Sequence, residues 1–399
     1  MGKKNSLVDK KYLMTFVLIT SLFFLWGFAH AILDVLNKHF QEVLEMTKSR
    51  SAMVQVTFYT GYFLTAIPAG LLINRHGYRS GVVTGLLLYG VGALLFIPGE
   101  HLMSFEFFLF SLFVIGCGLT FLETSANPYV TELGDRSTAA ARLNFAQSFN
   151  GFGAVCAPLI GGWFIFRENA SVAAPYALIG LIVLVAAIVF FRIRLPEIPH
   201  EENESGHVKN LARHFPFIFG VFALFSYEVS EISINSFFIN YATEGEWFDK
   251  PTATALLSFG GLTLFMCGRF IGSFVMRRIR AEKVLFACAS ATVATTAIVV
   301  ADCGIVSMIA LICGYLFESI MFPTIFAIAL RGLGKKTKRA SSFLMMTPVG
   351  GAVGPLAMGY VADCADMPAS FAVPLAGFIV VWAFATFTLN RKNQSTSLS

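Results

Sequence analysis

The sequence predicts an all-α membrane protein with twelve transmembrane helices arranged in two six-helix bundles. Of its 399 residues, 56% are hydrophobic and only 13% are charged, whereas soluble domains carry about 25% charged residues. The mean hydropathy of +0.69 reflects apolar runs long enough to cross a bilayer, which takes about 20 residues in a helix. These observations exclude a water-soluble globule, and twelve such runs leave no room for a soluble domain.

Short polar breaks separate the twelve runs. The first run follows Lys3, Lys4, Lys10 and Lys11 and superficially resembles a secretory signal, but its length and the lack of a small-residue cleavage site predict a retained span. The expected spans are 13–36, 52–73, 80–98, 105–130, 142–166, 172–192, 215–242, 251–277, 283–301, 305–331, 339–362 and 367–389.

One polar segment, 193–214, divides the chain into two halves of six spans each. It predicts an N-terminal six-helix bundle over 1–192, a cytoplasmic linker over 193–214 and a C-terminal six-helix bundle over 215–399. Of the 29 Lys and Arg residues, 23 fall on one side of the predicted membrane and 5 on the other. Because cytoplasmic loops are enriched in these residues, we expect both termini to be cytoplasmic.

The two halves resemble each other. Arg142 and Gly153 recur 197 residues later as Arg339 and Gly350, with further matches at Pro158 and Gly162. Glu123 and Pro128 recur 195 residues later as Glu318 and Pro323. Such a parallel repeat is typical of a two-bundle transporter whose binding site lies between the bundles near the midplane.

Acidic residues inside the spans are the most informative positions, because an ionised side chain in hydrocarbon costs several kcal/mol. They are Asp34, Glu123, Glu228, Glu231 and Glu318. They lie on the first, fourth, seventh and tenth spans, which are equivalent helices in a repeat of three-helix units and are expected to line a central cavity. Burial favours the neutral form of a carboxyl, so proton exchange is chemically available.

Polar residues on two spans predict a substrate site. Glu228 and Glu231 are three residues apart on one helix face, and we expect only one to face the cavity centre. Asn144, Gln147 and Asn150 form a stripe of amides on the fifth span. Amides suit sugar hydroxyls, although hydrogen bonds between neighbouring spans explain such a stripe equally well.

Aromatic and basic residues near these acids have expected roles too. Rings such as Phe28 and Tyr59 can stack on a sugar or simply pack. Arg269 is the only basic residue well inside a span, where it can pair with an acid or extend toward the cytoplasm, and we expect a structural or gating role. Arg75 and Arg79 lie at helix ends, where cations satisfy C-terminal carbonyls, which indicates a hinge.

Several motifs identify a family resemblance. AGLLINRHGYRSG (69–81) resembles the loop motif of the major facilitator superfamily, with Asn74 where an Asp is usual. FFLWGFAHAILD (23–34), FLETSANP (121–128), RLNFAQSFNGFGA (142–154), GRFIG (268–272) and FPTIF (322–326) resemble the fucose permease family of proton-coupled sugar symporters. The resemblance implies the major facilitator fold, with Asp34 as a proton-coupling acid and Glu123 as an acid that binds sugar and takes part in coupling. It also implies that Gln147 and Asn150 contact the sugar.

The chain departs from that pattern at a few positions. His30, Ala31 and Leu33 stand where the family's fucose transporter has asparagines around the first-span acid, and Glu231 stands where it has Gln. Glu318 is an additional acid. These differences leave open which sugar is carried and whether the coupling ion is a proton or sodium.

The predicted function is therefore proton-coupled import of a monosaccharide (fucose, glucose, galactose or a related sugar) across the inner membrane by alternating access. We expect a monomeric chain that is not an enzyme and uses no cofactor, metal or nucleic acid. A proton-driven exporter or antiporter of the same fold and a non-transporting sugar sensor are the alternatives. The predicted substrate contacts are Glu123, Gln147, Asn150, Asn144, Glu231, Glu228, Glu318, Tyr59 and Phe28.

The role of Asp34 gives a first prediction. The variant Asp34→Asn removes the titratable group, so it should abolish uphill accumulation of sugar while retaining some sugar exchange. Uptake of labelled sugar by membrane vesicles, with and without a pH gradient, measures both activities. Accumulation equal to that of the unmodified chain would overturn the assignment.

Overall fold

The protein is described here by a computed structural model. It describes residues 7–43, 51, 53–102, 104–135, 138–165, 171, 173–193, 195, 211–245 and 247–397. Within these ranges the side chains at 34–35, 37–43, 158, 162–165, 212, 335, 338 and 392–397 are outside the description. Most of the predicted linker 193–214 lies outside the described residues.

The first half of the chain forms long helices joined by short turns. They are α1 (Leu13–Val43), α3 (Met53–Leu94), α4 (Phe96–Leu102), α5 (Phe105–Glu132), α6 (Ala139–Ile165) and α7 (Ala173–Arg192), preceded by a short 3-10 turn, η1 (Lys10–Tyr12). The helix α3 contains two predicted spans, because Gly77 turns the chain inside it at φ 80°. A residue with a Cβ rarely adopts that backbone conformation.

The second half has more interruptions. It contains η3 (Leu211–Arg213), α8 (Phe215–Glu244), α9 (Lys250–Ala255), a π-helical turn η4 (Leu256–Leu262), α10 (Thr263–Met276), α11 (Ala281–Val300), α12 (Ile305–Glu318), α13 (Met321–Leu330), η5 (Gly334–Lys336), α14 (Thr337–Leu344), η6 (Thr347–Val349), α15 (Gly350–Cys364), α16 (Met367–Ser370) and α17 (Ala372–Ser397). Four predicted spans, 251–277, 305–331, 339–362 and 367–389, are thus each built from two or more helical pieces.

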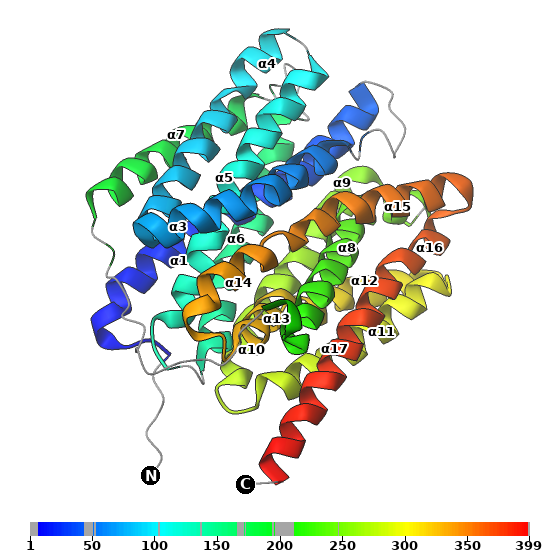
Figure 1. The fold of residues 1–399 in the computed structure, drawn as a ribbon. Coiled ribbons are helices and arrows are strands. Elements are labelled where there is room, and N and C mark those ends of the chain that lie inside the picture. Colours follow the sequence, from blue (N-terminus) through cyan, green and yellow to red (C-terminus); the bar gives the residue numbers. More distant parts are fainter. Residues whose placement is uncertain are drawn as a thin grey trace.

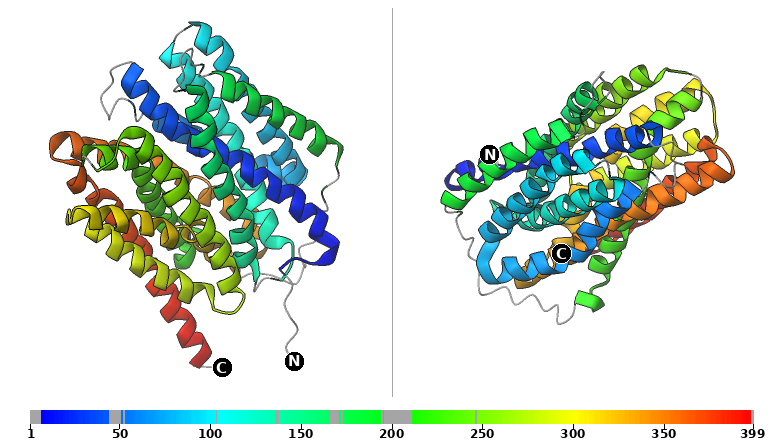
Figure 2. Two further views of the ribbon diagram at one scale, coloured as in Figure 1. Left: turned by 180° about the vertical axis from the view of Figure 1, so that it is seen from behind. Right: turned by 90° about the horizontal axis from the view of Figure 1, so that it is seen from above.

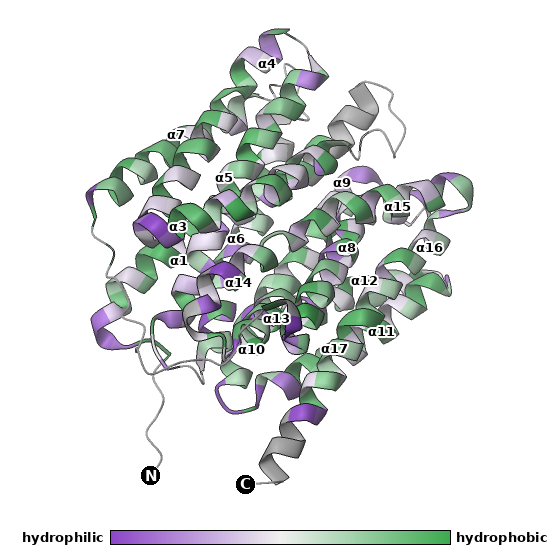
Figure 3. Ribbon diagram, in the orientation of Figure 1, coloured by the Kyte–Doolittle hydropathy of each residue, from purple (hydrophilic) through white to green (hydrophobic). Residues whose placement is uncertain are grey.

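The helices form two bundles that lie side by side, α1–α7 and α8–α17 (Figures 1 and 2). The first residues of α1 and the last residues of α17 lie at the same end of the molecule, called here the terminal end (Figure 1). Hydrophobic residues dominate the helices along most of their length (Figure 3). An even number of crossings gives this arrangement of α1 and α17.

The span count agrees with the prediction within the described residues. Ten helical segments there are long and apolar enough to cross a membrane. One of them, Met53–Leu102, holds the two spans on either side of Gly77, and α6 is a further apolar helix of 27 residues. The described helices therefore account for all twelve predicted spans, and the all-α membrane fold class is confirmed.

Two glycines let α1 and α6 pack with their backbones almost touching. A Cβ on Gly27 would lie 2.0 Å from the carbonyl oxygen of Asn150, and one on Gly153 would lie 2.1 Å from the carbonyl oxygen of Phe24. Small residues allow such close contact between spans. The contact brings the polar positions of α6 next to those of α1.

This packing gives a second prediction. The variant Gly153→Val places a side chain against backbone atoms that cannot move independently, so it should lower the free energy of unfolding by about 1–3 kcal/mol. Thermal unfolding of the purified protein in detergent measures the effect. Phe152→Val is the matched control, because Phe152 is on the same helix, is 49% exposed and meets α1 through the ring of Phe24 and not through backbone atoms. Equal stability of the two variants would contradict this account of the α1–α6 contact.

Candidate functional site

A cavity lies between the two bundles near the middle of the spans. The space that it encloses, together with the solvent at its open side, amounts to about 720 Å³. Seven spans contribute to its lining. Four of them, including α1, are in the first half of the chain and three are in the second half. The lining residues are Trp26, Gly27, His30, Ala31, Gln55, Tyr59, Glu123, Gln147, Asn150, Ala154, Glu228, Glu231, Ile232, Asn235, Leu262, Phe265, Arg269 and Phe322.

Glu123 is tied to α1 and α3 by a short chain of hydrogen bonds. The hydroxyl of Tyr62 donates to Oε1 of Glu123 at 2.7 Å. The Nε2 atom of His30 lies 2.8 Å from the same hydroxyl and 3.5 Å from Glu123 Oε1. The other ring nitrogen of His30, Nδ1, lies 3.2 Å from the hydroxyl of Tyr59.

The direction of these bonds follows from the donors available. Since the Tyr62 proton goes to Glu123, the Tyr62 oxygen accepts from Nε2–H of His30. In a neutral imidazole the remaining nitrogen, Nδ1, then accepts from Tyr59. The result is a continuous set of hydrogen bonds from Tyr59 through His30 and Tyr62 to Glu123.

Arg269 is buried, with 4% of its surface exposed, and it bridges the two bundles. From α10 its Nη1 donates to the carbonyl oxygen of Gln147 at 3.0 Å, to Gln147 Oε1 at 3.3 Å and to Asn150 Oδ1 at 2.8 Å on α6. The guanidinium also lies over the ring of Phe265 at 4.2 Å. It therefore does not extend toward the terminal end, and it makes no ion pair among the described residues.

A helix break supplies another partner for Arg269. Pro323 has no N–H, so the carbonyl of Ser319, four residues earlier, loses its helical donor. The Nε atom of Arg269 donates to this Ser319 oxygen at 3.0 Å. The break between α12 and α13 thus provides a polar backbone atom inside the bundle, which needs such a partner in a membrane.

The amides of α6 are held in place at the cavity wall. Gln147 donates from Nε2 to Asn127 Oδ1 at 3.2 Å, and its Oε1 faces Arg269. Asn150 accepts from Arg269 through Oδ1. None of the described residues accepts a hydrogen bond from its NH₂ group, which can therefore donate to a ligand. The wall therefore combines carboxylate, amide and guanidinium groups that suit a ligand rich in hydroxyls.

Both acids of α8 line the cavity, so the expectation that only one of them would face it is wrong. Residues three apart on a helix differ by only about 60° in direction, which allows both side chains to reach one space. Glu228 and Glu231 interact electrostatically with Arg269 across the cavity. Two like charges close together are costly, and the single cation reduces that cost.

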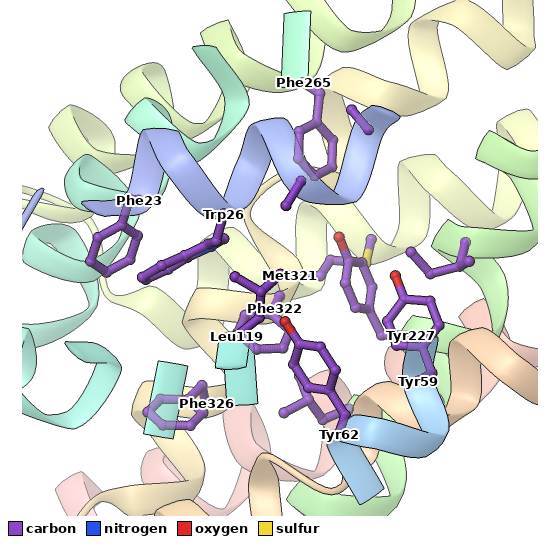
Figure 4. Packing of buried hydrophobic residues seen from close by; sticks show 14 of the residues in the cluster. Phe23, Trp26, Tyr59, Tyr62, Leu119, Tyr227, Phe265, Met321, Phe322 and Phe326 are labelled. Carbon is purple, nitrogen blue, oxygen red and sulfur yellow. The ribbon is translucent and has the colours of Figure 1, made fainter. Parts of the chain in front are cut away.

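Aromatic rings surround the polar groups. Figure 4 shows Trp26, Phe265, Phe322, Tyr59 and Tyr227 reaching the same region from different helices. Of these, Tyr59 was a predicted substrate contact, and it lines the cavity. The rings provide apolar surface on which the C–H face of a ligand can pack.

Three predicted substrate contacts, Asn144, Phe28 and Glu318, lie outside the cavity lining. Asn144 is fully buried and donates to Thr324 Oγ1 at 3.2 Å and to the Ala140 carbonyl at 2.9 Å, because steps of three residues drift around a helix and place it about 120° away from Asn150. Phe28 packs in the core. These two residues stabilise packing in this structure.

Glu318 occupies a separate small space inside the second bundle. That space is bounded by α8, α11 and α12 and includes Thr292, Thr295 and Thr296. Glu318 is 1% exposed. Its position shows that the sequence repeat with Glu123 does not place it at the wall of the central cavity.

Asp34 belongs to α1, but its side chain lies outside the described part of the structure. Of the predicted hinge residues, Arg79 donates from Nε to the Phe190 carbonyl at 3.3 Å and from Nη2 to the Phe191 carbonyl. It thereby caps the end of α7, the role expected of a cation at a helix C-terminus. Arg75 is exposed beside the turn at Gly77.

Among the described residues, hydrogen bonds join the two bundles on both sides of the cavity. On the terminal side, Ser273 Oγ donates to the Ala141 carbonyl at 2.8 Å, and the Asn144–Thr324 bond also joins the bundles. On the opposite side, Gln55 Nε2 donates to Ser236 Oγ at 3.5 Å, which is at the limit for a hydrogen bond.

Several lining residues were not predicted. His30 lies one helical turn before Asp34, and Asn235 lies one turn after Glu231, so the four-residue spacing on each helix was a usable signal. Gln55 and Phe265 had no such signal. Within the described residues, no group of three His, Cys, Asp or Glu side chains is placed to hold a metal ion.

Comparison with known proteins agrees with this architecture. The family model of the Major Facilitator Superfamily matches residues 12–347. The L-fucose-proton symporter of Escherichia coli is 35% identical, with 96% of this chain and 95% of that protein aligned. A glucose/galactose transporter of Brucella abortus is also 35% identical, over 95% of this chain and 94% of that protein.

A solved structure gives the same result. The crystal structure of FucP, a Major Facilitator Superfamily transporter in the outward conformation, superposes with a TM-score of 0.81 at 35% identity. The alignment covers 95% of this chain and 99% of FucP. The chain therefore belongs to the major facilitator superfamily; it is a transporter and not an enzyme.

Proposed function

We propose that this chain imports a monosaccharide together with protons across the inner membrane by alternating access, with both termini in the cytoplasm and one chain as the working unit. The observation that carries the proposal is the cavity itself, where Glu123, Gln147 and Asn150 meet at the junction of the bundles. Relatives named as L-fucose-proton symporter and glucose/galactose transporter support a sugar and a proton as cargo.

The side chains of the cavity have complementary roles toward a sugar. Glu123 accepts hydrogen bonds from hydroxyl groups, whereas the amide of Asn150 can donate to them. Gln147 is positioned by Asn127 and Arg269. Glu228, Glu231 and Tyr59 line the same space and are proposed as further contacts.

The proton is proposed to act through the acids of the first bundle. By family resemblance Asp34 is a coupling acid, and Glu123 is joined to α1 through Tyr62 and His30. A hydrogen-bonded row of this kind can pass a proton between its ends. A neutral carboxyl lowers the cost of closing the cavity around the sugar, since an unpaired charge would be desolvated.

The sugar is proposed to enter from the side opposite the terminal end. Opening on that side separates Gln55 from Ser236, whereas opening at the terminal end separates Ser273 from Ala141. The related FucP structure is in the outward conformation. Release toward the cytoplasm would then require separation of α6 from α10 and α13.

The test of the function is uptake of labelled fucose, glucose, galactose and N-acetylglucosamine by right-side-out vesicles. An inward pH gradient should drive accumulation of at least one of these sugars, and a sodium gradient without a pH gradient should not. Accumulation driven by sodium alone would replace the proton as the coupling ion. Binding without any uptake would indicate a sensor, and gradient-driven loss of sugar would indicate an exporter.

The row of hydrogen bonds gives a further prediction. Tyr62→Phe keeps the ring but removes the bond to Glu123, and hydrogen bonds to charged groups contribute about 1.5–3 kcal/mol. Gradient-driven uptake should fall about tenfold or more, while counterflow exchange of the accepted sugar should decrease much less.

The matched control is Tyr89→Phe. Tyr89 lies on the same helix and its buried hydroxyl donates to the Leu25 carbonyl of α1 at 3.1 Å, but it does not line the cavity. This variant should keep gradient-driven uptake. An equal loss of gradient-driven uptake in both variants would show that the tyrosine hydroxyls support packing and take no part in proton coupling.

A further inference from the structure

A second hollow lies on the side of the molecule where the two bundles meet, between α3 of the first bundle and α8 and α14 of the second. It contains about 1610 Å³ of empty space, compared with about 720 Å³ for the central cavity. Its walls are almost entirely apolar and include Phe63, Phe217, Val221, Phe225, Phe343 and Met346. We call it the side groove. Figure 1 shows α14 between α3 and α13 on this face.

The length of the side groove along α8 is close to the thickness of the hydrocarbon layer of one membrane leaflet. On α8 its wall runs from Phe217 to Phe225, which is about 12 Å by helical rise. Half of a hydrocarbon core of about 30 Å is about 15 Å. Phe222, which also lines the side groove, is 55% exposed on its surface, so the side groove opens toward the bilayer and not into the central cavity.

Two cations, Lys336 and Arg339, line the end of the side groove nearest the terminal end. They belong to a basic segment, 331–339, that carries five Lys and Arg residues. The charge count predicts that this end is cytoplasmic. Basic clusters directly next to a span at that surface attract anionic lipid headgroups.

Arg339 differs sharply from its counterpart in the sequence repeat. Arg142 is fully buried and makes five hydrogen bonds, four of them to carbonyl oxygens, such as that of Val130 at 2.9 Å and that of Thr131 at 2.6 Å. Arg339 is exposed and makes no hydrogen bond or ion pair with the described residues. The same position thus has an internal role in one half, whereas in the other half it is exposed beside an apolar hollow.

We propose that the side groove binds an anionic phospholipid of the cytoplasmic leaflet. One acyl chain lies along the phenylalanines of α8 and α14, and the phosphate is held by Arg339 and Lys336. A planar guanidinium suits a phosphate because it can donate two parallel hydrogen bonds. This ligand is separate from the transported sugar.

The position of the lipid gives it a consequence for transport. It would contact Phe63 of the first bundle and the α8 and α14 walls of the second, so it would connect the two bundles beside the barrier that closes the terminal end. Bound lipid should therefore favour the state that is closed at that end. Its removal should favour the opposite state.

Native mass spectrometry of the purified full chain in detergent tests the proposal. The probes are phosphatidylglycerol, phosphatidylcholine with the same acyl chains, and glycerol phosphate without chains. Phosphatidylglycerol should bind in a 1:1 complex more tightly than phosphatidylcholine, and Arg339→Gln should weaken its binding about fivefold. Glycerol phosphate should bind weakly because it cannot fill the apolar walls.

Two further variants make the result specific. Arg278→Gln removes an exposed cation at the end of α10 that does not line the side groove, and it should leave phosphatidylglycerol binding unchanged. Val221→Trp fills the side groove without changing charge, and it should weaken binding of phosphatidylglycerol while thermal unfolding stays near that of the unmodified chain.

Three results would overturn the proposal. They are equal binding of the two phospholipids, an equal loss of binding in Arg339→Gln and Arg278→Gln, and binding of glycerol phosphate as tight as that of phosphatidylglycerol. The last of these would show a free-phosphate site in place of a lipid site.

Discussion

The structure depends on one constraint, which is that a charged side chain inside a membrane must have polar partners within the protein. Arg269 meets it by reaching from α10 to Gln147 and Asn150 on α6 and to the carbonyl freed by Pro323. The same contacts join the two bundles. A cavity of polar groups at the bundle junction is thus also the place where the bundles are held together.

This double role suits a transporter that changes shape. A ligand that competes for the amides of α6 necessarily alters the contacts of Arg269, so binding and movement of the bundles share the same atoms. On the other side of the cavity, Glu123 depends on Tyr62 and His30. The close contact of α1 and α6 at Gly27 brings these two groups of residues to one space.

Much of the fold was predictable, because hydropathy and the count of basic residues report directly on how often the chain crosses a membrane. The acids of the fourth and seventh spans were also found, since a carboxyl in an apolar run has few explanations. The direction in which a side chain points from its helix was harder to predict from the sequence. Asn144 and Gln147 differ by one step in a regular pattern, yet only Gln147 reaches the cavity.

The remaining differences come from three-dimensional packing. Glu318 is related by sequence to Glu123, but at the end of α12 it lies in a small space of its own. The partners of Arg269 lie 122 and 119 residues away in the chain, and nothing local in the sequence specifies them. His30 was visible as a departure from the family pattern, whereas its bond to Tyr62 required the structure.

The most direct test of the central claim is a structure of the chain with the sugar that it accumulates. The account predicts density for the sugar at the junction of the bundles, within hydrogen-bond distance of Glu123 and Asn150. It also predicts that at least one bond from Arg269 to the amides of α6 is exchanged for a bond to the sugar. A sugar bound elsewhere, with the contacts of Arg269, Gln147 and Asn150 unchanged, would contradict it.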